Sequence, residues 1–316
     1  MQLDRRQFIV LSSGALAVSP LARAFAQQPP AATPSAATQP AAPVVTTFTD
    51  VRRNVGIFTA RGGTIGFLIN KDGVVAIDTQ YPDTAKTCVD GLKQKAGRGI
   101  DVVINTHHHG DHTGGNGVFK ADSKKIVAQA KVPELMKMVA AASPNAAAPT
   151  FPDATFDKSW TEKVGDETIT AWYHGPGHTS GDAIVHFEKA HVVHMGDLLF
   201  HERHPRVDRA AGASIANWVT ILEKASKDFP ADTIYIAGHA KDGLQPAVDR
   251  KAVLHFRDYL SAVLVFAKKE IDRGQSKDAL AATASLPGFE GYQGGGVLTL
   301  KGVLENAYDE LTAKKS

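Results

Sequence analysis

Residues 101–115 hold the feature that most constrains the fold of this 316-residue chain, a short apolar run followed at once by a histidine-rich turn. The run DVVIN at 101–105 predicts a buried strand, and the turn THHHGDH follows it directly. Three histidines and one aspartate of the turn fit the pattern His-x-His-x-Asp-His: His107, His109, Asp111 and His112. Side chains that leave a strand end can converge on one point, and neutral imidazoles are good zinc ligands. The pattern therefore predicts a metal site, with His108 directed away from it; the alternative is a cluster of solvated histidines.

Hydrophobic periodicity predicts strands and helices in two successive groups. Strands are expected at 51–60, 64–70, 73–78, 101–105 and 125–128, and again at 167–172, 183–187, 191–194 and 233–237. Helices are expected at 84–96, 132–142, 214–227, 248–272, 277–285 and 300–314, with a long loop at 143–156. Two halves that each run from strands into helices indicate an α/β protein in which two sheets pack face to face with helices outside.

The histidine-rich turn resembles the metal-binding signature of the metallo-β-lactamase superfamily. Further residues of that signature take their places in the expected order: Asp78 ends the run 74–78, His178 lies in GPGHT, Asp197 in MGD and His239 in AGH. The resemblance covers roughly residues 50–240. It implies an αβ/βα four-layer sandwich, the metallo-β-lactamase fold.

The resemblance also implies a role for each of these residues. His107, His109 and His178 would hold one zinc ion, Asp111, His112 and His239 would hold a second, and Asp197 would bridge the two. Asp78 would accept a hydrogen bond from a ligand histidine and fix its tautomer. Two zinc ions can share a hydroxide nucleophile and polarise the scissile group, while Asp111 orients the hydroxide and passes a proton to the leaving group. Iron or manganese also suits these ligands.

Alternatives stay open at several of these positions. Asp197 is also placed to cap the next helix, and Asp78 is also a common turn residue. The segment 198–206 should lie near the mouth of the site, where His201 and His204 are candidates for contact with substrate. A solvated polar loop is the alternative there, and the loop at 143–156 is a candidate for a further wall of the pocket.

The resemblance implies a metal-dependent hydrolase that uses a metal-activated hydroxide on a small ester, lactone, amide or related substrate. Within the superfamily, an aspartate at the bridging position is typical of the glyoxalase-like and general hydrolase branches, whereas zinc β-lactamases generally have cysteine or serine there. Asp197 therefore counts against a dedicated β-lactamase, an activity that stays open as an alternative. Two further alternatives are a mononuclear iron dioxygenase acting on sulfur compounds and a non-catalytic metal-binding protein.

Residues 1–26 are typical of an export signal. Arg5-Arg6-Gln7-Phe8 stands ahead of a moderately apolar run and resembles a twin-arginine signal, with cleavage expected after Ala24 or Ala26. An uncleaved membrane anchor is the alternative. Residues 27–46, rich in proline and alanine, predict a disordered tether, which leaves 47–316 as the hydrolase domain. The expected location is the periplasm or the medium, with no stable membrane span after cleavage, because no run reaches about 18 apolar residues.

The net charge of +2 comes from the N-terminal segment alone. Residues 1–26 hold three arginines and one aspartate, so residues 27–316 carry 32 basic and 32 acidic side chains. A nucleic-acid partner is not expected, because neutralising phosphates requires a basic surplus or stripe. The single cysteine, Cys88, excludes an intramolecular disulfide and is expected to be a buried thiol. The expected partner is therefore a small molecule recognised inside a pocket.

Overall fold

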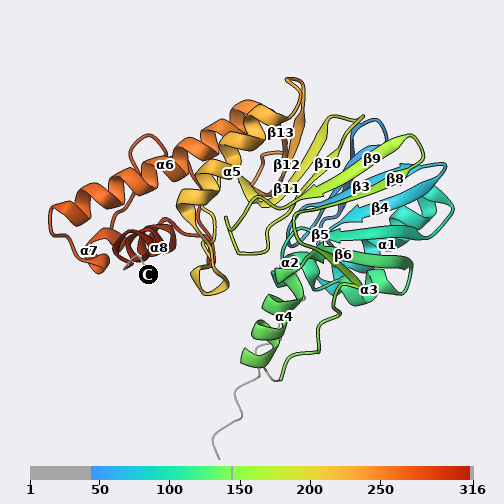
Figure 1. Ribbon diagram of the computed structural model, residues 1–316, viewed down its shortest axis with the longest axis horizontal. Helices are drawn as coiled ribbons and strands as arrows, with labels where there is room; N and C mark the ends of the chain where they lie inside the picture. Colours follow the sequence, from blue (N-terminus) through green and yellow to red (C-terminus); the bar gives the residue numbers. More distant parts are fainter. Residues whose placement is uncertain (1–43, 144, 314–316) are drawn as a thin grey trace, which may run out of the picture. The chain divides into compact units, whose positions relative to one another are not determined.

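The computed structural model describes residues 44–143 and 145–313 (Figure 1). The predicted export signal at 1–26 and most of the predicted tether, residues 27–43, lie outside the described residues. Among the helices that the structure describes, none combines the length and the apolar character that a bilayer crossing requires.

A seven-stranded sheet has the order β1-β2-β3-β4-β5-β6-β7. Its strands are β1 (Thr47–Arg52), β2 (Val55–Thr59), β3 (Ile65–Asn70), β4 (Gly73–Ile77), β5 (Ile100–Asn105), β6 (Ser123–Gln129) and β7 (Ala154–Phe156). Neighbours from β1 to β4 are antiparallel, and neighbours from β4 to β7 are parallel. Because β4 and β5 are parallel, Asp78 and the turn at 106–112 emerge at the same edge of this sheet.

A six-stranded sheet has the order β13-β12-β11-β10-β9-β8. Its strands are β8 (Ser159–Val164), β9 (Glu167–Trp172), β10 (Ile184–Phe187), β11 (Val192–His201), β12 (Ile234–Ala240) and β13 (Ala247–Val248). β11 and β12 are parallel, and the other neighbours are antiparallel. The β11 ladder is irregular at Gly196, whose φ is +50° and where a Cβ would lie 2.5 Å from Thr106 Oγ1. Glycine thus lets this sheet approach the histidine-rich turn of the other.

The two sheets share one apolar cluster between them and are covered by helices on their outer faces (Figure 1). The shared cluster includes Ile57, Val75 and Ile104 from the first sheet and Ile169, Val185 and Ile236 from the second. Outside the second sheet, α5 (Ile215–Asp228), α6 (Arg250–Asp272) and α8 (Leu300–Thr312) bury their apolar faces. Outside the first sheet, α1 (Pro82–Ala96) and α3 (Asn116–Lys120) do the same, with Cys88 fully buried. This arrangement confirms the predicted α/β sandwich.

Local sequence explains where several helices begin and end. The remaining helices are α2 (Gly110–Thr113), α4 (Lys131–Ala142), α7 (Lys277–Ala281) and the 3₁₀ turn η1 (Arg209–Ala211). α1 begins at a proline, which suits the first helical position, and is followed by Gly97 in the left-handed region. Ser214 caps α5, Asp249 caps α6 and Thr299 caps α8, each through a side-chain oxygen that accepts a backbone N–H.

The structure differs from the sequence expectations in several places, one of which is the helix expected at 277–285: α7 ends at Ala281. The single strand expected at 51–60 is the hairpin β1–β2, because Arg53 and Asn54 take positive φ angles of 46° and 67° without a glycine to mark the turn. The expected loop at 143–156 ends in β7, and the polar edge strand β8 was not expected. β11 continues to His201 instead of ending at 194, since Leu198, Leu199 and Phe200 are buried.

Glu310 of α8 ties the C-terminal helices to the start of α5. Its carboxylate accepts hydrogen bonds from Ile215 N at 2.8 Å, Ala216 N at 3.0 Å and Ser214 Oγ at 3.1 Å, and it pairs with Arg209 at 3.4 Å. A carboxylate at a helix N-terminus satisfies amides that have no partner within the helix. The contact holds the segment 208–214 in place beside the histidine-rich turn.

Candidate metal centre

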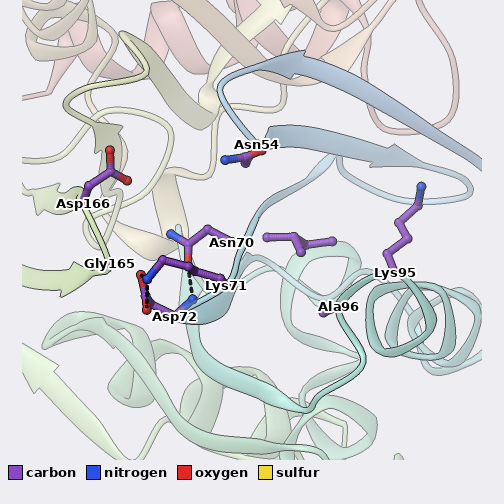
Figure 2. A pocket seen from close by; sticks show the side chains of 9 residues that line it. Asn54, Asn70, Lys71, Asp72, Lys95, Ala96, Gly165 and Asp166 are labelled. Carbon is purple, nitrogen blue, oxygen red and sulfur yellow. Dashed lines mark hydrogen bonds and ion pairs between the residues drawn. The ribbon is translucent and has the colours of Figure 1, made fainter.

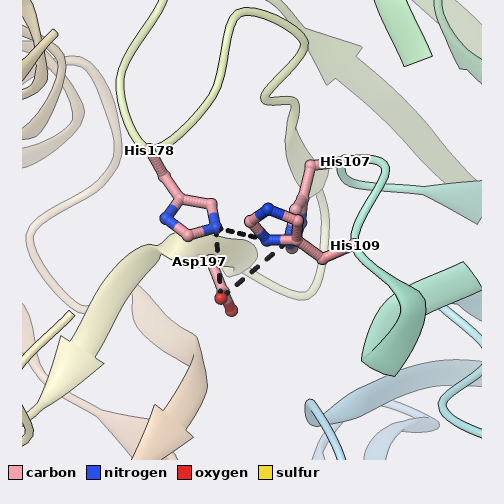
Figure 3. A group of neighbouring side chains, drawn as sticks. All are labelled: His107, His109, His178 and Asp197. Carbon is pink, nitrogen blue, oxygen red and sulfur yellow. Dashed lines mark hydrogen bonds and ion pairs between the residues drawn. The ribbon is translucent and has the colours of Figure 1, made fainter. Parts of the chain in front are cut away.

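Four buried side chains point toward one another where the edges of the two sheets meet (Figure 3). They are His107 and His109 from the turn after β5, His178 from the loop before β10, and Asp197 from β11. His109 Nδ1 lies 3.2 Å from His107 Nε2 and 2.8 Å from His178 Nε2. Asp197 Oδ2 lies 3.4 Å from His178 Nε2 and 3.9 Å from His107 Nε2. The first group therefore brings three imidazole nitrogens and one carboxylate oxygen together.

A second group adjoins the first and consists of Asp111, His112 and His239. Asp111 Oδ2 lies 3.1 Å from His239 Nε2 and 3.8 Å from His112 Nε2. The other oxygen of Asp197, Oδ1, lies 3.0 Å from His112 Nε2 and 3.5 Å from His239 Nε2. The two oxygens of the Asp197 carboxylate thus face two different sets of candidate ligand atoms. Glycine is needed at position 238 for this arrangement, because a Cβ there would lie 2.1 Å from Asp197 Oδ1. All seven residues predicted as metal ligands fall into these two groups.

Asp78 lies on the Nδ1 side of His112, whereas Asp111 and Asp197 lie on the Nε2 side of the ring. Its Oδ2 accepts a hydrogen bond from His112 Nδ1 at 2.7 Å, and its two oxygens also accept from Thr106 N and Thr106 Oγ1, both at 2.7 Å. With Nδ1 bound in this way, His112 directs Nε2 into the centre. Thr106 Oγ1 in turn lies 3.0 Å from His107 Nδ1, which leaves His107 Nε2 for the first group. This is the place that the sequence resemblance implied for Asp78.

Asp208 is a further carboxylate of the site that sequence reasoning missed. Its Oδ2 lies 2.8 Å from His109 Nε2 and 2.9 Å from Arg206 Nη2, while its Oδ1 accepts from Ala211 N. Asp208 therefore fixes the tautomer of His109 so that Nδ1 points into the first group. The only signal in the sequence was an aspartate in the polar segment after β11, with no motif around it. His108, which belongs to neither group, lies 4.0 Å from the same carboxylate.

Replacing Asp208 by alanine is expected to weaken zinc binding by about 10- to 100-fold, because His109 loses the acceptor that orients it. Competition with a chromogenic chelator measures this change. The matched control is Asp232→Ala, which removes an Asp–His contact of the same 2.8 Å length to His191 at the surface. Equal zinc affinity in Asp208→Ala, Asp232→Ala and the wild-type protein would show that Asp208 does not support the centre.

The residues present fit a pair of divalent cations. His112 Nε2 and Asp197 Oδ1 are buried at the middle of the cluster, 3.0 Å apart, but neither atom has a partner in hydrogen-bonding alignment. Burial lowers the pKa of His178 to about 3, so its imidazole is neutral and its lone pair is free at neutral pH. For His112 burial acts the same way, but the carboxylates of Asp197, Asp111 and Asp78 outweigh it and hold its pKa well above the ordinary value. The centre therefore favours added positive charge.

Asp182 holds the loop that carries His178, and sequence reasoning missed it as well. Its carboxyl group accepts hydrogen bonds from Gly177 N at 3.1 Å, Thr179 N at 2.8 Å and Thr179 Oγ1 at 2.6 Å. An aspartate four residues after His178, in the run GHTSGD, is the kind of turn signal that could have indicated it. Burial raises the pKa of Asp182 to about 7 despite these donors.

The raised pKa of Asp182 predicts a pH-dependent stability. The carboxyl group of an unfolded aspartate has a pKa of about 3.9, whereas that of Asp182 in the folded chain has a pKa of about 7. The folded chain therefore holds this proton more tightly between about pH 4 and pH 7. The free energy of unfolding then falls as pH rises through this window, by up to about 1.4 kcal/mol per pH unit. Asp182→Asn is expected to remove this slope, measured as the difference between variant and wild type in urea unfolding of the metal-free protein. A constant difference across the window would contradict the assignment.

A pocket of about 390 Å³ opens over the second group. It is lined by Tyr81, His109, Gly110, Asp111, Asp197, Arg206, His239 and residues 295–298. Neither His201 nor His204 is among them, because β11 carries the chain past the centre before these residues occur. His201 Nδ1 lies 2.8 Å from Gln245 O, and buried His204 lies 2.8 Å from the Tyr259 hydroxyl. The loop at 143–156 does not line this pocket either.

A larger hollow, of about 920 Å³, lies at the other end of β4 (Figure 2). It is lined by polar and charged side chains such as Asn54, Lys71, Asp72 and Asp166. β4 begins at Gly73 beside this hollow and ends next to Asp78, so a strand length separates the hollow from the metal centre. The size of this hollow therefore gives no information about a reaction at the metal centre.

Comparison with known proteins agrees with this geometry. The sequence profile of the metallo-beta-lactamase superfamily matches residues 58–239, more than half of the chain. The chain belongs to the metallo-β-lactamase superfamily. Together with the two ligand groups, membership makes the protein a metal-dependent hydrolase of that superfamily.

Two curated members of the superfamily, each named metallo-beta-lactamase type 2, are among its relatives. The protein from Elizabethkingia meningoseptica is 26% identical over 196 residues, which is 62% of this chain and 74% of that protein. The protein from Bacillus cereus is 24% identical over 197 residues, which is 62% of this chain and 72% of that protein.

Solved structures show the same fold. A metallo-beta-lactamase from Pontibacter korlensis superimposes with a TM-score of 0.57 at 20% identity, covering 69% of this chain and 99% of that one. A sec-alkylsulfatase from Pseudomonas sp. superimposes with a TM-score of 0.64 at 16% identity, covering 85% of this chain and 50% of that one. At these identities the likeness concerns the fold alone.

Proposed function

We propose that the protein is an exported dinuclear zinc hydrolase of the glyoxalase-like, general branch, acting on a small ester, lactone, amide or related substrate. One observation carries the proposal: Asp197 Oδ2 faces the first ligand group at 3.4 and 3.9 Å, and Asp197 Oδ1 faces the second at 3.0 and 3.5 Å. A carboxylate placed in this way can bridge two cations. Its identity as aspartate, where zinc β-lactamases generally have cysteine or serine, supports the general branch.

When bound, two zinc ions supply Lewis-acid polarisation of the scissile group and lower the pKa of a water to about 7. Asp111, which lines the pocket, is the group of the chain that can move the proton. Burial would raise its pKa, but His112 and His239 outweigh burial and keep the pKa below its ordinary value. Asp111 is therefore ionised at neutral pH and can take a proton from the attacking water. The same carboxyl group then gives that proton to the leaving oxygen or nitrogen, so no other acid is required.

Hydrolysis of β-lactams is the second candidate, favoured by the names of the curated relatives at 24–26% identity. A mononuclear iron dioxygenase is less well supported, since it would leave the second group of Asp111, His112 and His239 without a role.

The test is turnover by the mature, zinc-loaded protein of a chromogenic ester, lactone, lactam, thioester and phosphodiester. The proposal predicts that an ester, lactone or simple amide has the highest kcat/KM. A lactam with the highest kcat/KM would establish the second candidate instead, and oxygen consumption with a persulfide by iron-loaded protein would establish the dioxygenase. No turnover of any of these substrates would favour a non-catalytic metal-binding protein.

Export is tested separately, by fractionating a bacterial host that expresses the full chain. The twin-arginine-type pattern at Arg5-Arg6 predicts mature protein in the periplasm or medium. Replacing both arginines by lysine should retain the full-length chain in the cytoplasm. Full-length protein in the cytoplasm for both chains would contradict export.

A further inference from the structure

One wall of the pocket over the metal centre comes from the C-terminal part of the chain. Gly295, Gly296, Val297 and Leu298 line this pocket together with Asp111 and His239. They lie more than fifty residues beyond 58–239, the region that matches the superfamily profile. We call residues 294–298 the C-terminal turn. The shape of the pocket thus depends on a segment that the shared region does not contain.

Hydrogen bonds of Gln293 fix the base of the C-terminal turn to the segments that follow β11 and β12. Gly295 N donates to Leu298 O at 2.8 Å, and Leu298 N donates to Gly295 O at 3.0 Å, which closes the turn. At its base, Gln293 N donates to Glu202 O at 2.9 Å, in the segment after β11. The side chain of Gln293 pairs with Asp242, after β12, through two hydrogen bonds of 2.7 Å. Because β11 carries Asp197 and β12 carries His239, the turn has a defined position over the ligand groups.

The wall that this turn presents is apolar. Val297 is 72% exposed although it is a branched hydrocarbon side chain, and it lines the pocket beside Leu298. Tyr81 adds a ring to the same pocket, with the Arg61 guanidinium 4.3 Å from the centre of that ring. The floor, in contrast, is polar and consists of Asp111, His239, Asp197 and His109, and the charged side chain of Arg206 also lines the pocket. A ligand whose polar end reaches the floor would therefore place its remaining atoms against hydrocarbon.

We propose that Val297 is a specificity-determining residue that selects small carbonyl compounds bearing an alkyl chain next to the reacting group. Burying alkyl carbons against Val297 and Leu298 removes apolar surface from water on both sides, so affinity should rise with chain length. For the reaction this inference rests on the proposed function, but the selection of alkyl chains by the wall can be measured without turnover.

The test uses n-alkanethiols from ethanethiol to pentanethiol, whose thiolate is a zinc ligand and whose chain varies in length alone. Calorimetric Kd values for zinc-loaded wild-type protein should fall about threefold per added methylene. In Val297→Asp this dependence should shrink to less than about 1.5-fold per methylene, because a hydrated carboxylate replaces the hydrocarbon surface. The matched control is Val265→Asp, a valine of α6 that is 69% exposed and lines a separate hollow, and it should keep the threefold dependence.

The outcomes separate this inference from the proposed function. The inference is overturned if Val297→Asp keeps the wild-type dependence on chain length, or if wild-type Kd values do not change with chain length. Kinetics with p-nitrophenyl acetate and butyrate provide the second measurement. Suppose that neither ester is hydrolysed, and that the dependence of Kd on thiol chain length is lost in Val297→Asp alone. The assignment of Val297 then holds, and the proposed hydrolysis of esters is wrong. If both esters are hydrolysed with the same butyrate preference in wild type and Val297→Asp, the hydrolase stands and the role of Val297 does not.

Discussion

Replacing Asp111 by asparagine is expected to lower kcat of the zinc-loaded protein by about 10²- to 10⁴-fold with little change in KM. Asparagine keeps an oxygen at the position that faces His239, 3.1 Å away in the wild-type protein, but it cannot take a proton. The substitution therefore separates proton transfer from the role of Asp111 as a ligand. Steady-state kinetics on the best substrate of the panel, together with zinc content, measure the two effects.

Two companion variants complete this experiment. Asp111→Ala removes the oxygen as well and should lower zinc content in addition to kcat. Asp83→Asn changes an exposed aspartate that pairs with Arg61 at 2.8 Å but does not line the pocket, and it should retain wild-type kinetics. Equal kcat in wild type and Asp111→Asn, at equal zinc content, would show that the proton passes through another group.

Replacing Asp197 by alanine is expected to have the largest effect, with kcat/KM lower by more than about 10³-fold and bound zinc reduced to one ion or none. The physical reason is that both ligand groups lose an oxygen at once, and Lewis-acid stabilisation of several kcal/mol depends on both metals. Burial alone would raise the pKa of Asp197, but His239 and His112 outweigh it, so the carboxylate is ionised and available as a ligand. Atomic absorption and kinetics on one preparation measure both quantities.

The control for this substitution is Asp232→Ala, which removes a surface carboxylate and should keep two zinc ions and full activity. Asp197→Ala with two tightly bound zinc ions would contradict a bridging role. A metal-free unfolding curve for each variant distinguishes loss of ligands from loss of the fold.

The local part of the site was predictable from the sequence because its residues are close together along the chain. His107, His109, Asp111 and His112 occupy one turn after β5, and the apolar strand before them fixes where that turn lies. His178, Asp197 and His239 are far away in sequence, and only their resemblance to the superfamily signature connected them with the turn. The structure places all of them within the two ligand groups.

Two further parts of the site, Asp208 and the C-terminal turn, carry no local signal. Asp208 acts on His109 across 99 positions of the chain, and the surrounding sequence is that of an ordinary capped turn. Likewise, residues 294–298 form a wall only because Gln293 pairs with segments after β11 and β12, contacts that depend on the tertiary fold. For His201 and His204, nearness to Asp197 in sequence suggested substrate contact; the buried continuation of β11 carries them past this pocket, and contact with a substrate stays a prediction.

The metal content of the isolated protein tests the central claim most directly. Purified mature protein, dialysed against metal-free buffer and analysed by inductively coupled plasma mass spectrometry, is predicted to contain two zinc ions per chain. Zinc titration of chelator-stripped protein should show two equivalents, falling to one or none in Asp197→Ala. A single iron per chain with no zinc, or no metal taken up by the stripped protein, would contradict the dinuclear zinc centre.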